Sequence, residues 1–335
     1  MQQEVLFEIK NLCKYFPASH KRSVKAVDNI SLKIYRGETL SLVGESGCGK
    51  TTLGRTVLGI YPKTSGEICY KGNVWEKPSK SQQKEFQKSN QMIFQDPYSC
   101  LDPRMSIGSI IEEGMKVHFS MSPAERQKRC EELLERVGLP KEMLSRFPHE
   151  LSGGQRQRSG IARAVATQPE FIVCDEPIAA LDSSIQAQVI NLLMDLQQEM
   201  GLTYLFISHD LSMVRHISDR ICIMYLGAVA ELGTAQDIDE NPIHPYTKSL
   251  LSAITQALFS AVPDINDEHW SENRIKLEGE IPNPINAPKG CKFCTRCAIA
   301  KDICKKQAPE LAEIEPGHFV ACHCWKEMVG KRKER

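Results

Sequence analysis

The chain has no surplus of charge of either sign. Its 335 residues include 42 Lys and Arg against 42 Asp and Glu, so the formal net charge at pH 7 is zero. Proteins that bind nucleic acids by bulk electrostatic attraction carry a positive surplus. The balance therefore argues against a nucleic-acid partner.

Long apolar runs are also missing. A membrane-spanning helix needs roughly 18 or more consecutive apolar residues, whereas the most apolar stretch, 221–232, is shorter and contains Glu231. Glu4 and the lack of an apolar segment near the N-terminus predict no secretory signal. We therefore expect an intracellular chain that is soluble or sits on a membrane surface.

Cysteine, in contrast, is plentiful. Of the 13 cysteines, six lie within residues 291–324 and the others are scattered through the first two thirds of the chain. A chain without a secretory signal stays where thiols are reduced, so a disulfide framework is not expected. A local cluster in such a chain is more typical of a metal site.

Strand and helix patterns alternate along the first 240 residues. This alternation predicts an α/β fold in which helices cover a parallel sheet. Strands are predicted at Val5–Lys10, Ile30–Tyr35, Thr39–Val43, Phe171–Cys174 and Thr203–Ser208, and helices at Thr51–Leu58, Pro123–Val137, Gly153–Thr167, Ser183–Met200, Leu211–Ile217 and His244–Thr255. Arg36-Gly37 predicts a hairpin between the second and third strands. Pro282, Pro284 and Pro288 mark a turn-rich linker, and the change of pattern predicts one domain at 1–240 and another at 241–335.

A phosphate-binding loop follows the third predicted strand. Gly44-Glu45-Ser46-Gly47-Cys48-Gly49-Lys50-Thr51 matches G-x-x-x-x-G-K-[ST] in full, and Thr52 continues it into a helix. Glycines let backbone N–H groups turn toward phosphate oxygens, and the helix N-terminus adds positive potential. Lys50 is expected to neutralise the β- and γ-phosphates and Thr51 to ligate Mg²⁺. An ordinary strand–turn–helix corner is the weaker alternative, so we expect these eight residues and Thr52 to bind a nucleoside triphosphate.

Two carboxylates end the apolar strand at 171–174. Asp175 is expected to hold Mg²⁺, and Glu176 to orient the attacking water as a general base. Acidic pairs at strand ends are also common as plain surface charge. Their occurrence in a chain with a phosphate-binding loop favours hydrolysis.

The sharpest signal is Leu151-Ser152-Gly153-Gly154-Gln155. Ser-Gly-Gly at the start of a helix makes a second phosphate-binding N-terminus, which one nucleotide on one domain does not need. Here the chain, over about residues 4–240, resembles the ATP-binding cassette (ABC) family. The resemblance implies a P-loop NTPase cassette with a mixed sheet core and a helical subdomain at about 97–167, and an ATP shared between two cassettes.

Other motifs occur in the order of the same family. The resemblance implies that Gln95 meets Mg²⁺ and the attacking water, that His209 contacts the γ-phosphate, and that Mg²⁺ is bound through Thr51, Gln95 and Asp175. Ser152, Gly153, Gly154, Gln155 and Asp182 would contact the ATP of the partner cassette. Phe16 or the adjacent Tyr15 would stack on adenine. Ala179 stands where relatives generally carry Ser, which removes one hydroxyl.

A narrower resemblance covers the end of the chain. His244-Pro245-Tyr246-Thr247, Glu278–Pro282 and Gly290-Cys291 are similar to the C-terminal extension of oligopeptide and dipeptide importer ATPases, and 147–158 to their DppF or OppF type. The resemblance implies a peripheral protein at the cytoplasmic face of the inner membrane. Its partners would be a sister ATPase in a heterodimer, two permeases and, indirectly, an extracytoplasmic peptide-binding protein.

The cysteine cluster also fits this extension. The resemblance implies a [4Fe–4S] cluster on Cys291, Cys297, Cys304 and Cys322. Thiolates also suit tetrahedral Zn²⁺, and free thiols are a third possibility. Cys294 and Cys324 are additional, so the ligand set is open by one or two residues.

The leading hypothesis is therefore the ATP-hydrolysing motor of a dipeptide or oligopeptide importer. Nickel, glutathione or a glycoside are alternative cargoes of similar transporters. A soluble cassette ATPase of translation or DNA repair is a second class, disfavoured because the chain has one phosphate-binding loop and no sustained heptads. A regulatory module that binds ATP without hydrolysing it is a third, disfavoured by Asp175 and Glu176.

Overall fold

The computed structural model describes residues 4–18, 22–260, 279–280 and 282–333. Their contacts divide the chain into two compact units. Unit 1 comprises Met1–Glu8, Lys33–Thr39 and Ile68–Ser208, and unit 2 comprises Ile9–Leu32, Leu40–Glu67 and His209–Arg335. Three strands run through both units: β1 (Val5–Pro17), β2 (Ser23–Tyr35) and β4 (Ser65–Tyr70).

Unit 1 is built around a parallel set of strands. β7 (Phe171–Asp175) pairs with β6 (Asn90–Ile93) on one side and with β8 (Thr203–Ser208) on the other. Asn90 and Thr203 both lie opposite Phe171, so the three strands start in register. Every residue of β7 and β8 is buried, as expected for strands covered on both faces.

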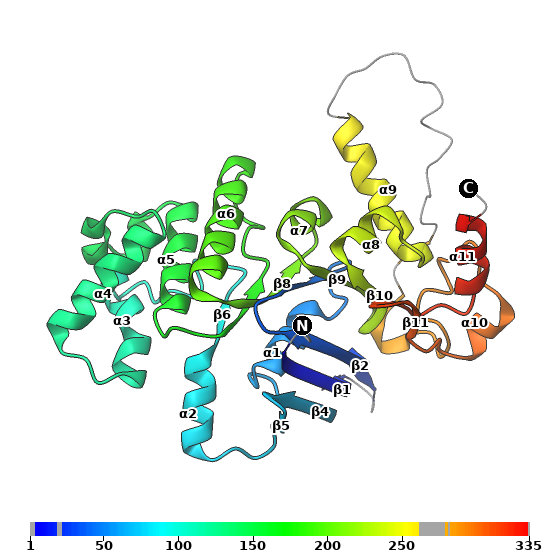
Figure 1. Cartoon of the computed structure of the whole chain (residues 1–335), viewed down its shortest axis with the longest axis horizontal. Coiled ribbons are helices and arrows are strands. Elements are labelled where there is room, and N and C mark those ends of the chain that lie inside the picture. The colour runs from blue at the N-terminus through cyan, green and yellow to red at the C-terminus, as the bar shows by residue number, and fades with distance from the viewer. Residues whose placement is uncertain (1–3, 19–21, 261–278, 281, 334–335) are drawn as a thin grey trace. The chain divides into compact units, whose positions relative to one another are not determined.

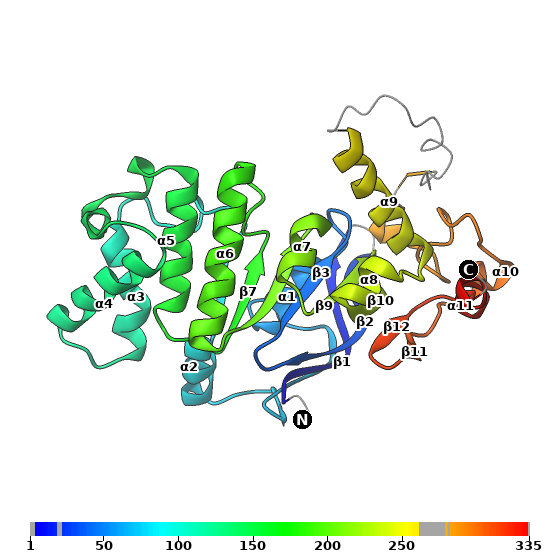
Figure 2. The same cartoon turned by 45° about the horizontal axis from the view of Figure 1, so that its top comes forward.

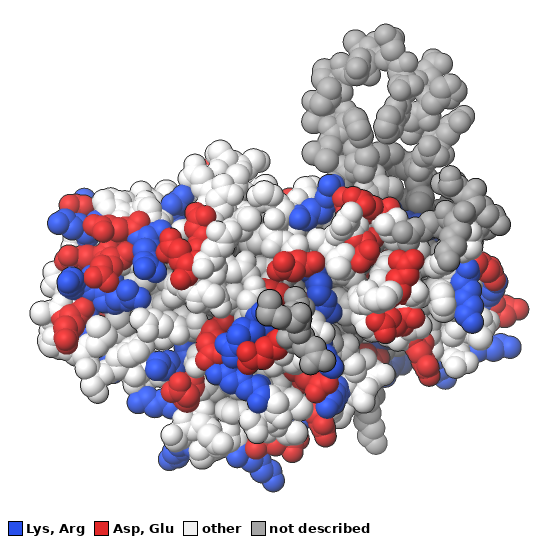
Figure 3. All heavy atoms as spheres, in the orientation of Figure 1, with Lys and Arg blue, Asp and Glu red and all other residues white. Residues whose placement is uncertain are grey.

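Most other elements of unit 1 are helices. α3 (Ile107–His118), α4 (Pro123–Arg136) and α5 (Gly153–Val165) pack on one another, and both views show them as one cluster (Figures 1 and 2). The remaining elements are β5 (Asn73–Val74), α2 (Lys80–Ser89), α6 (Ser183–Met200) and the short 3₁₀ helices η1 (Lys141–Ser145) and η2 (Pro148–Glu150). Acidic and basic side chains are interspersed over α3 and α4 (Figure 3).

Unit 2 contains a mixed sheet. β3 (Thr39–Val43) runs parallel to β9 (Arg220–Tyr225), which pairs antiparallel with β10 (Ala228–Thr234). β10 then pairs with β12 (His318–Val320), and β12 with β11 (Ala312–Glu315). The last strands of the chain thus extend the same sheet as the strand that precedes the phosphate-binding loop.

The helices of unit 2 are mostly short. They are α1 (Lys50–Val57), α7 (Leu211–Ile217), α8 (Ala235–Glu240), α9 (Pro245–Ser260), η4 (Pro284–Asn286), α10 (Asp302–Lys306) and α11 (Trp325–Lys333). α8 packs against β10 and α7, and α9 against β10 and α7. None of the helices in the described part of the chain is long and apolar enough to cross a membrane.

The predicted hairpin at 30–43 is wrong. β2 belongs to a four-stranded sheet, next to β1, whereas β3 belongs to the other sheet and pairs with β9. Burial explains the difference, because all five residues of β3 are buried while β2 alternates between buried and exposed positions. The turn at Gly37, which has φ of 77°, thus leads the chain from one sheet into another. Of the sequence motif at 278–282, Glu278 and Ile281 lie outside the described residues.

Candidate functional site

The phosphate-binding loop lies in unit 2, between β3 and α1. A Cβ at Gly49, where φ is 105°, would lie 1.9 Å from the backbone oxygen of Ala26, and one at Gly44 would lie 2.2 Å from that of Met224. Neither position can take a side chain, because backbone atoms cannot move aside. Glycine at these two positions therefore lets the backbone of the loop lie directly against the neighbouring strands.

Lys50 lies inside this loop. Its side chain is buried, and its ammonium donates hydrogen bonds to the carbonyl oxygens of Gly44, at 2.7 Å, and Glu45, at 3.2 Å. Ser46 and Gly47 are exposed, and Thr51 and Thr52 are half-buried on the first turn of α1. The loop thus offers a buried cation, exposed backbone and a helix N-terminus, which together suit a polyphosphate.

Cys48 is the loop's buried thiol. Burial raises its pKa, while the nearby Lys50 ammonium opposes that shift. Its carbonyl oxygen accepts a hydrogen bond from the N–H of Gly227, at 2.8 Å. Cys48 therefore serves the loop as a small neutral side chain.

The two candidate adenine-stacking rings are neighbours on β1, and both are half-buried. The Tyr15 hydroxyl donates to Asp28 at 2.6 Å, and the Lys25 ammonium lies 5.3 Å from the Tyr15 ring centroid. The Phe16 ring meets Tyr61 edge-on at 5.5 Å, with the Lys14 ammonium 4.7 Å from its centroid. Each ring is fixed by different neighbours.

In unit 1, Gln95 and Glu176 come together. The Gln95 side-chain amide donates to the Glu176 carboxylate at 3.0 Å, although the two residues are 81 positions apart. Glu176 has a φ of 45°, an uncommon conformation for a residue other than Gly. Its N–H bonds to the carbonyl oxygen of Ile207 on β8, and Asp175 is completely buried at the end of β7. A strained residue held beside an amide partner is a common arrangement at functional sites.

The Ser152–Gln155 segment starts α5. The Ser152 hydroxyl accepts from the N–H of Gln155 at 3.3 Å, and the Gln155 side chain accepts from the N–H of Ser152 at 2.9 Å. A Cβ on Gly154 would come within 2.8 Å of Ile185, so this glycine lets α6 approach α5 closely. Asp182 caps α6 from an exposed position without a side-chain hydrogen bond to the cap. His209, in unit 2, is exposed directly after β8.

The predicted metal cluster is wrong. All six cysteines of 291–324 lie among the described residues, yet that part of the chain holds no group of three or more His, Cys, Asp or Glu side chains that could hold a metal ion. The structure fits neither the [4Fe–4S] cluster expected on Cys291, Cys297, Cys304 and Cys322 nor the zinc alternative.

The thiols are packed as neutral side chains. Burial raises the pKa of Cys291 to about 11 and of Cys322 to about 12. Cys304 and Cys324 are buried like apolar side chains, and the Cys324 thiol lies 3.8 Å from the carbonyl oxygen of Ile299. Close spacing in the sequence therefore reflects packing of small side chains here, and a disulfide is likewise absent among the described cysteines.

Two residues that hold the phosphate-binding loop from the C-terminal side were not predicted from the sequence as residues of this site. The Glu45 carboxylate accepts from Arg296 at 2.9 Å, and the Glu45 N–H donates to the Tyr246 hydroxyl at 2.9 Å. These residues are 251 and 201 positions away from Glu45. No local pattern marks Arg296, and the motif that contains Tyr246 did not predict this contact, because such contacts arise only when the chain folds.

Two families match this chain. Residues 27–179 match the family described as ABC transporter, and residues 230–256 and 255–304 match the one described as oligopeptide/dipeptide transporter, C-terminal region. The second match covers most of β10, all of α9 and the segment that contains Arg296.

Full-length relatives are similar throughout. The chain is 51% identical over 336 residues to the putative oligopeptide transport ATP-binding protein YkfD of Bacillus subtilis (strain 168), covering 100% of both chains. It is 51% identical to the oligopeptide transport ATP-binding protein AppF of the same organism, covering 96% of this chain and 98% of the relative. To OppF of that organism it is 50% identical, with 95% and 96% covered.

Solved structures share the fold. The ATP-binding cassette MJ0796, a dimer bound to ADP and Pi, matches with a TM-score of 0.64 at 29% identity, covering 69% of this chain and 99% of that one. CbiO1 from Clostridium perfringens matches with a TM-score of 0.63 at 25% identity, covering 77% and 100%. The prediction of a P-loop NTPase cassette with a mixed sheet and helices is therefore confirmed.

Proposed function

Because the chain belongs to the ABC transporter family, among its oligopeptide-transport ATP-binding proteins, we propose that it is the ATP-hydrolysing motor of a peptide importer. Similarity to such proteins over the whole length carries this proposal. The Gln95–Glu176 contact adds a chemical argument, since it joins a carboxylate suited to general base catalysis to an amide suited to orienting water.

The individual roles are proposed as follows. Lys50 and the backbone of residues 44–52 bind the triphosphate, and Glu176 orients the attacking water with Gln95. His209 contacts the γ-phosphate, and Phe16 or Tyr15 packs on adenine. Ser152–Gln155 and Asp182 contact the ATP of the second cassette, since a serine-capped helix start binds anions.

Mg²⁺ fits this set of donors. Thr51, Gln95 and Asp175 offer a hydroxyl, an amide and a carboxylate, the oxygen ligands that Mg²⁺ prefers. When bound with ATP, Mg²⁺ neutralises charge on the phosphate oxygens. Asp175 is completely buried, and a charged carboxylate in such a place is stabilised by a strong charge partner of this kind.

We also propose the setting in which the motor works. It pairs with a sister ATPase, drives two membrane permeases, and lies peripherally on the cytoplasmic face of the cell membrane, with an extracytoplasmic peptide-binding protein supplying cargo. The cassette occupies about residues 1–240, with a helical subdomain at about 97–167, and 241–335 form the cysteine-rich extension typical of peptide importers. The match of residues 230–304 to the transporter C-terminal family supports this division.

Two substitutions test hydrolysis in the assembled transporter. Glu176→Gln should retain ATP binding and lower turnover by about a hundredfold or more, because general base catalysis typically contributes this much. Lys50→Ala should weaken ATP binding itself, because it removes the buried ammonium. ATPase rates and ATP dissociation constants are the measurements.

Glu199→Gln is the matched control, since Glu199 is an exposed carboxylate on α6 that pairs with Arg136. It should leave both quantities unchanged. Turnover of Glu176→Gln at the native rate would refute the assignment of the base.

A further inference from the structure

One short stretch of the C-terminal region, residues 290–296, is firmly docked in unit 2. We call it the clamp segment. Its Phe293 is buried among Tyr225, Tyr246 and His244, with ring centroids 5.3, 5.4 and 5.6 Å away. At Gly290, a Cβ would lie 2.2 Å from the backbone oxygen of Cys304, so the backbones are in direct contact. Buried aromatic contacts of this kind hold a segment in one position.

The clamp segment ends in an arginine that reaches the phosphate-binding loop. One terminal nitrogen of Arg296 donates to both carboxylate oxygens of Glu45, at 3.0 and 2.9 Å. The side chains are only 8% and 21% exposed, so water screens the pair weakly. Burial by itself lowers the pKa of Arg296, but Tyr225 and Glu45 raise it on balance, so the guanidinium stays charged. Arg296 thus makes a charge-assisted contact inside the fold.

Glu45 is tied by its backbone as well as by its side chain. Its N–H donates to the Tyr246 hydroxyl, and its carbonyl oxygen accepts from the Lys50 ammonium. A displacement of Glu45 would therefore also displace one of the carbonyl oxygens to which the Lys50 ammonium donates a hydrogen bond. Pro282, Asn283 and Pro284 line a hollow together with Glu45 and its neighbours Ser46 and Gly47, so the C-terminal region meets this loop twice.

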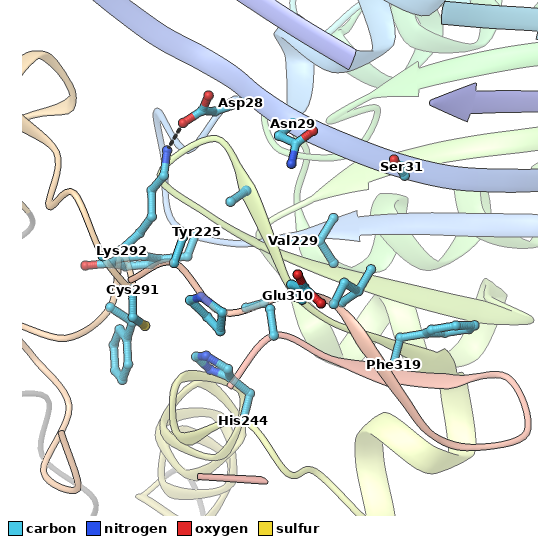
Figure 4. Close-up of a pocket in the computed structure, with 18 of the residues that line it drawn as sticks. Asp28, Asn29, Ser31, Tyr225, Val229, His244, Cys291, Lys292, Glu310 and Phe319 are labelled. Carbon is cyan, nitrogen blue, oxygen red and sulfur yellow. Dashed lines mark hydrogen bonds and ion pairs between the residues drawn. The ribbon is translucent and has the colours of Figure 1, made fainter. Parts of the chain in front are cut away.

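A second cation of the clamp segment, Lys292, is linked through Asp28 to Tyr15, one of the two candidate adenine-stacking rings. Figure 4 shows Lys292 extending to Asp28 on β2, beside a cavity of about 570 Å³, and the Nζ–Oδ2 distance is 2.5 Å. The other Asp28 oxygen accepts from the Tyr15 hydroxyl at 2.6 Å. Burial alone raises the pKa of Asp28, but the hydrogen bonds from Lys292 and Tyr15 lower it on balance, so the carboxylate is charged and links the two.

We propose that Arg296 and Lys292 are positioning residues for nucleotide binding: the clamp segment holds Glu45 of the phosphate-binding loop and, through Asp28, the ring of Tyr15. This rests on the proposed function, because it assigns a regulator to the same ATP site. It makes the C-terminal region a determinant of ATP affinity.

Loss of either cation should act on binding and spare the chemical step. Both side chains act through residues that hold the loop or the aromatic ring, whereas the Gln95–Glu176 pair belongs to unit 1. Loss of a positioning residue of this type raises the KM for ATP and leaves kcat nearly constant. A residue needed only for stability would instead lower the active fraction and therefore the apparent kcat.

The test measures ATP dissociation constants of the full-length chain, and KM and kcat in the assembled transporter. For Arg296→Gln we expect ATP affinity to fall about tenfold, which corresponds to about 1.4 kcal/mol. For Lys292→Gln we expect a fall of about threefold, and Arg296→Lys should recover part of the loss because it restores the charge. Lys305→Gln is the matched control, since Lys305 lies in the same region but is exposed and pairs with the nearby Asp302.

Coupling to the loop is checked with Glu45→Gln. Because Arg296 acts through Glu45, the two losses should not add. The double variant of Arg296→Gln and Glu45→Gln should bind ATP no more weakly than the single variant with the lower ATP affinity. Native ATP affinity in Arg296→Gln and Lys292→Gln would overturn the proposal, as would additive losses in the double variant. If Arg296→Gln does not fold, unchanged affinity in Arg296→Lys and Lys292→Gln overturns it in the same way.

The proposed function is tested separately by the wild-type chain and Lys50→Ala. If the wild type binds ATP and Lys50→Ala does not, the site stands and only the clamp proposal is at stake. If the wild type does not bind ATP, the proposed function fails together with the inference.

Discussion

At the scale of single residues, a buried carboxylate organises the start of the last long helix. Glu231 on β10 is completely buried and accepts hydrogen bonds from the N–H groups of Ile243 and His244, at 2.8 and 3.0 Å. The His318 ring on β12 lies 2.8 Å from the same carboxylate. Three separate parts of unit 2 thus meet at one side chain, and its burial is sustained by these partners.

The neighbouring His244 predicts how stability depends on pH. Burial lowers its pKa from 6.5 to about 4, although the Glu231 carboxylate opposes that shift. Its Nδ1 accepts from the N–H of Tyr246 at 3.1 Å, which requires the neutral ring. In the unfolded chain His244 is therefore protonated below about pH 6.5, whereas in the folded chain it is protonated only below about pH 4.

The stability contributed by neutral His244 is complete above pH 6.5 and is lost as the pH falls toward 4. We expect the unfolding free energy to drop by about 2 kcal/mol between pH 7 and pH 5 on this account. Urea unfolding of the wild type and His244→Asn measures it, because the variant should show a flatter pH dependence by this amount. Parallel pH profiles for the two proteins would contradict the prediction.

At the scale of elements, the ends of two predicted helices agree with the structure because capping residues mark them. The predicted helix at Pro123–Val137 is α4 at Pro123–Arg136, and the predicted helix at Ser183–Met200 has the same bounds in the structure. Ser122 forms a capping box with Glu125 at the start of α4. Gly201, with φ of 66°, ends α6 in the left-handed conformation that favours glycine. Such capping signals lie within a few residues of the helix end, so the sequence alone predicts where the helix begins or ends.

Ser122→Ala should destabilise α4. The Ser122 hydroxyl accepts from the N–H of Glu125 at 3.3 Å, and its loss leaves a helix donor without its cap, which costs about 1 kcal/mol. Thermal unfolding of the isolated chain is the measurement. Ser120→Ala, at an exposed position just before the cap, is the control and should unfold as the wild type does; equal midpoints for all three proteins would rule out the cap.

Strands were harder to predict than helices. β1 runs from Val5 to Pro17 where a strand was predicted only to Lys10, and no strand was predicted at Asn90–Ile93, where β6 lies. A strand is stable only through its neighbours, and those of β6 are 81 residues away at β7. The wrong hairpin at 30–43 has the same origin, because pairing with β9 determines the place of β3.

At the scale of the whole molecule, transport itself is the prediction. Cells in which Glu176→Gln replaces the native chain should lose uptake of labelled dipeptides or longer peptides, because stalled hydrolysis stops the permease cycle. The peptide length that is lost identifies the cargo class. Membrane association of the variant is measured in parallel.

Glu199→Gln cells should take up peptide at the native rate. Undiminished peptide uptake in Glu176→Gln cells, with the variant at the membrane, would exclude peptide as the cargo and direct the search to nickel, glutathione or glycosides. A variant that never reaches the membrane would instead favour a soluble ATPase.

Some parts of the candidate site are short sequence motifs, and others depend on contacts between residues far apart in the chain. The loop at 44–52, the acidic pair at 175–176 and the segment at 151–155 were visible because each is a short contiguous motif whose chemistry depends on spacing. The contact of Gln95 with Glu176 joins two such motifs, and only the structure shows it as a hydrogen bond. The cysteines misled for the opposite reason, since their close spacing in the sequence says nothing of how the thiols are buried or oriented.

The sequence by itself determined the cassette fold, the family and the residues expected to bind and hydrolyse ATP, because backbone turns, helix caps and phosphate-binding loops are encoded within a few positions. Only the tertiary structure decided which sheet receives β3, that β12 extends the sheet of β3 and β9, and that Arg296 and Lys292 reach Glu45 and Asp28. These depend on contacts across hundreds of residues. Burial and charge pairing select such contacts, and they act only on a folded chain.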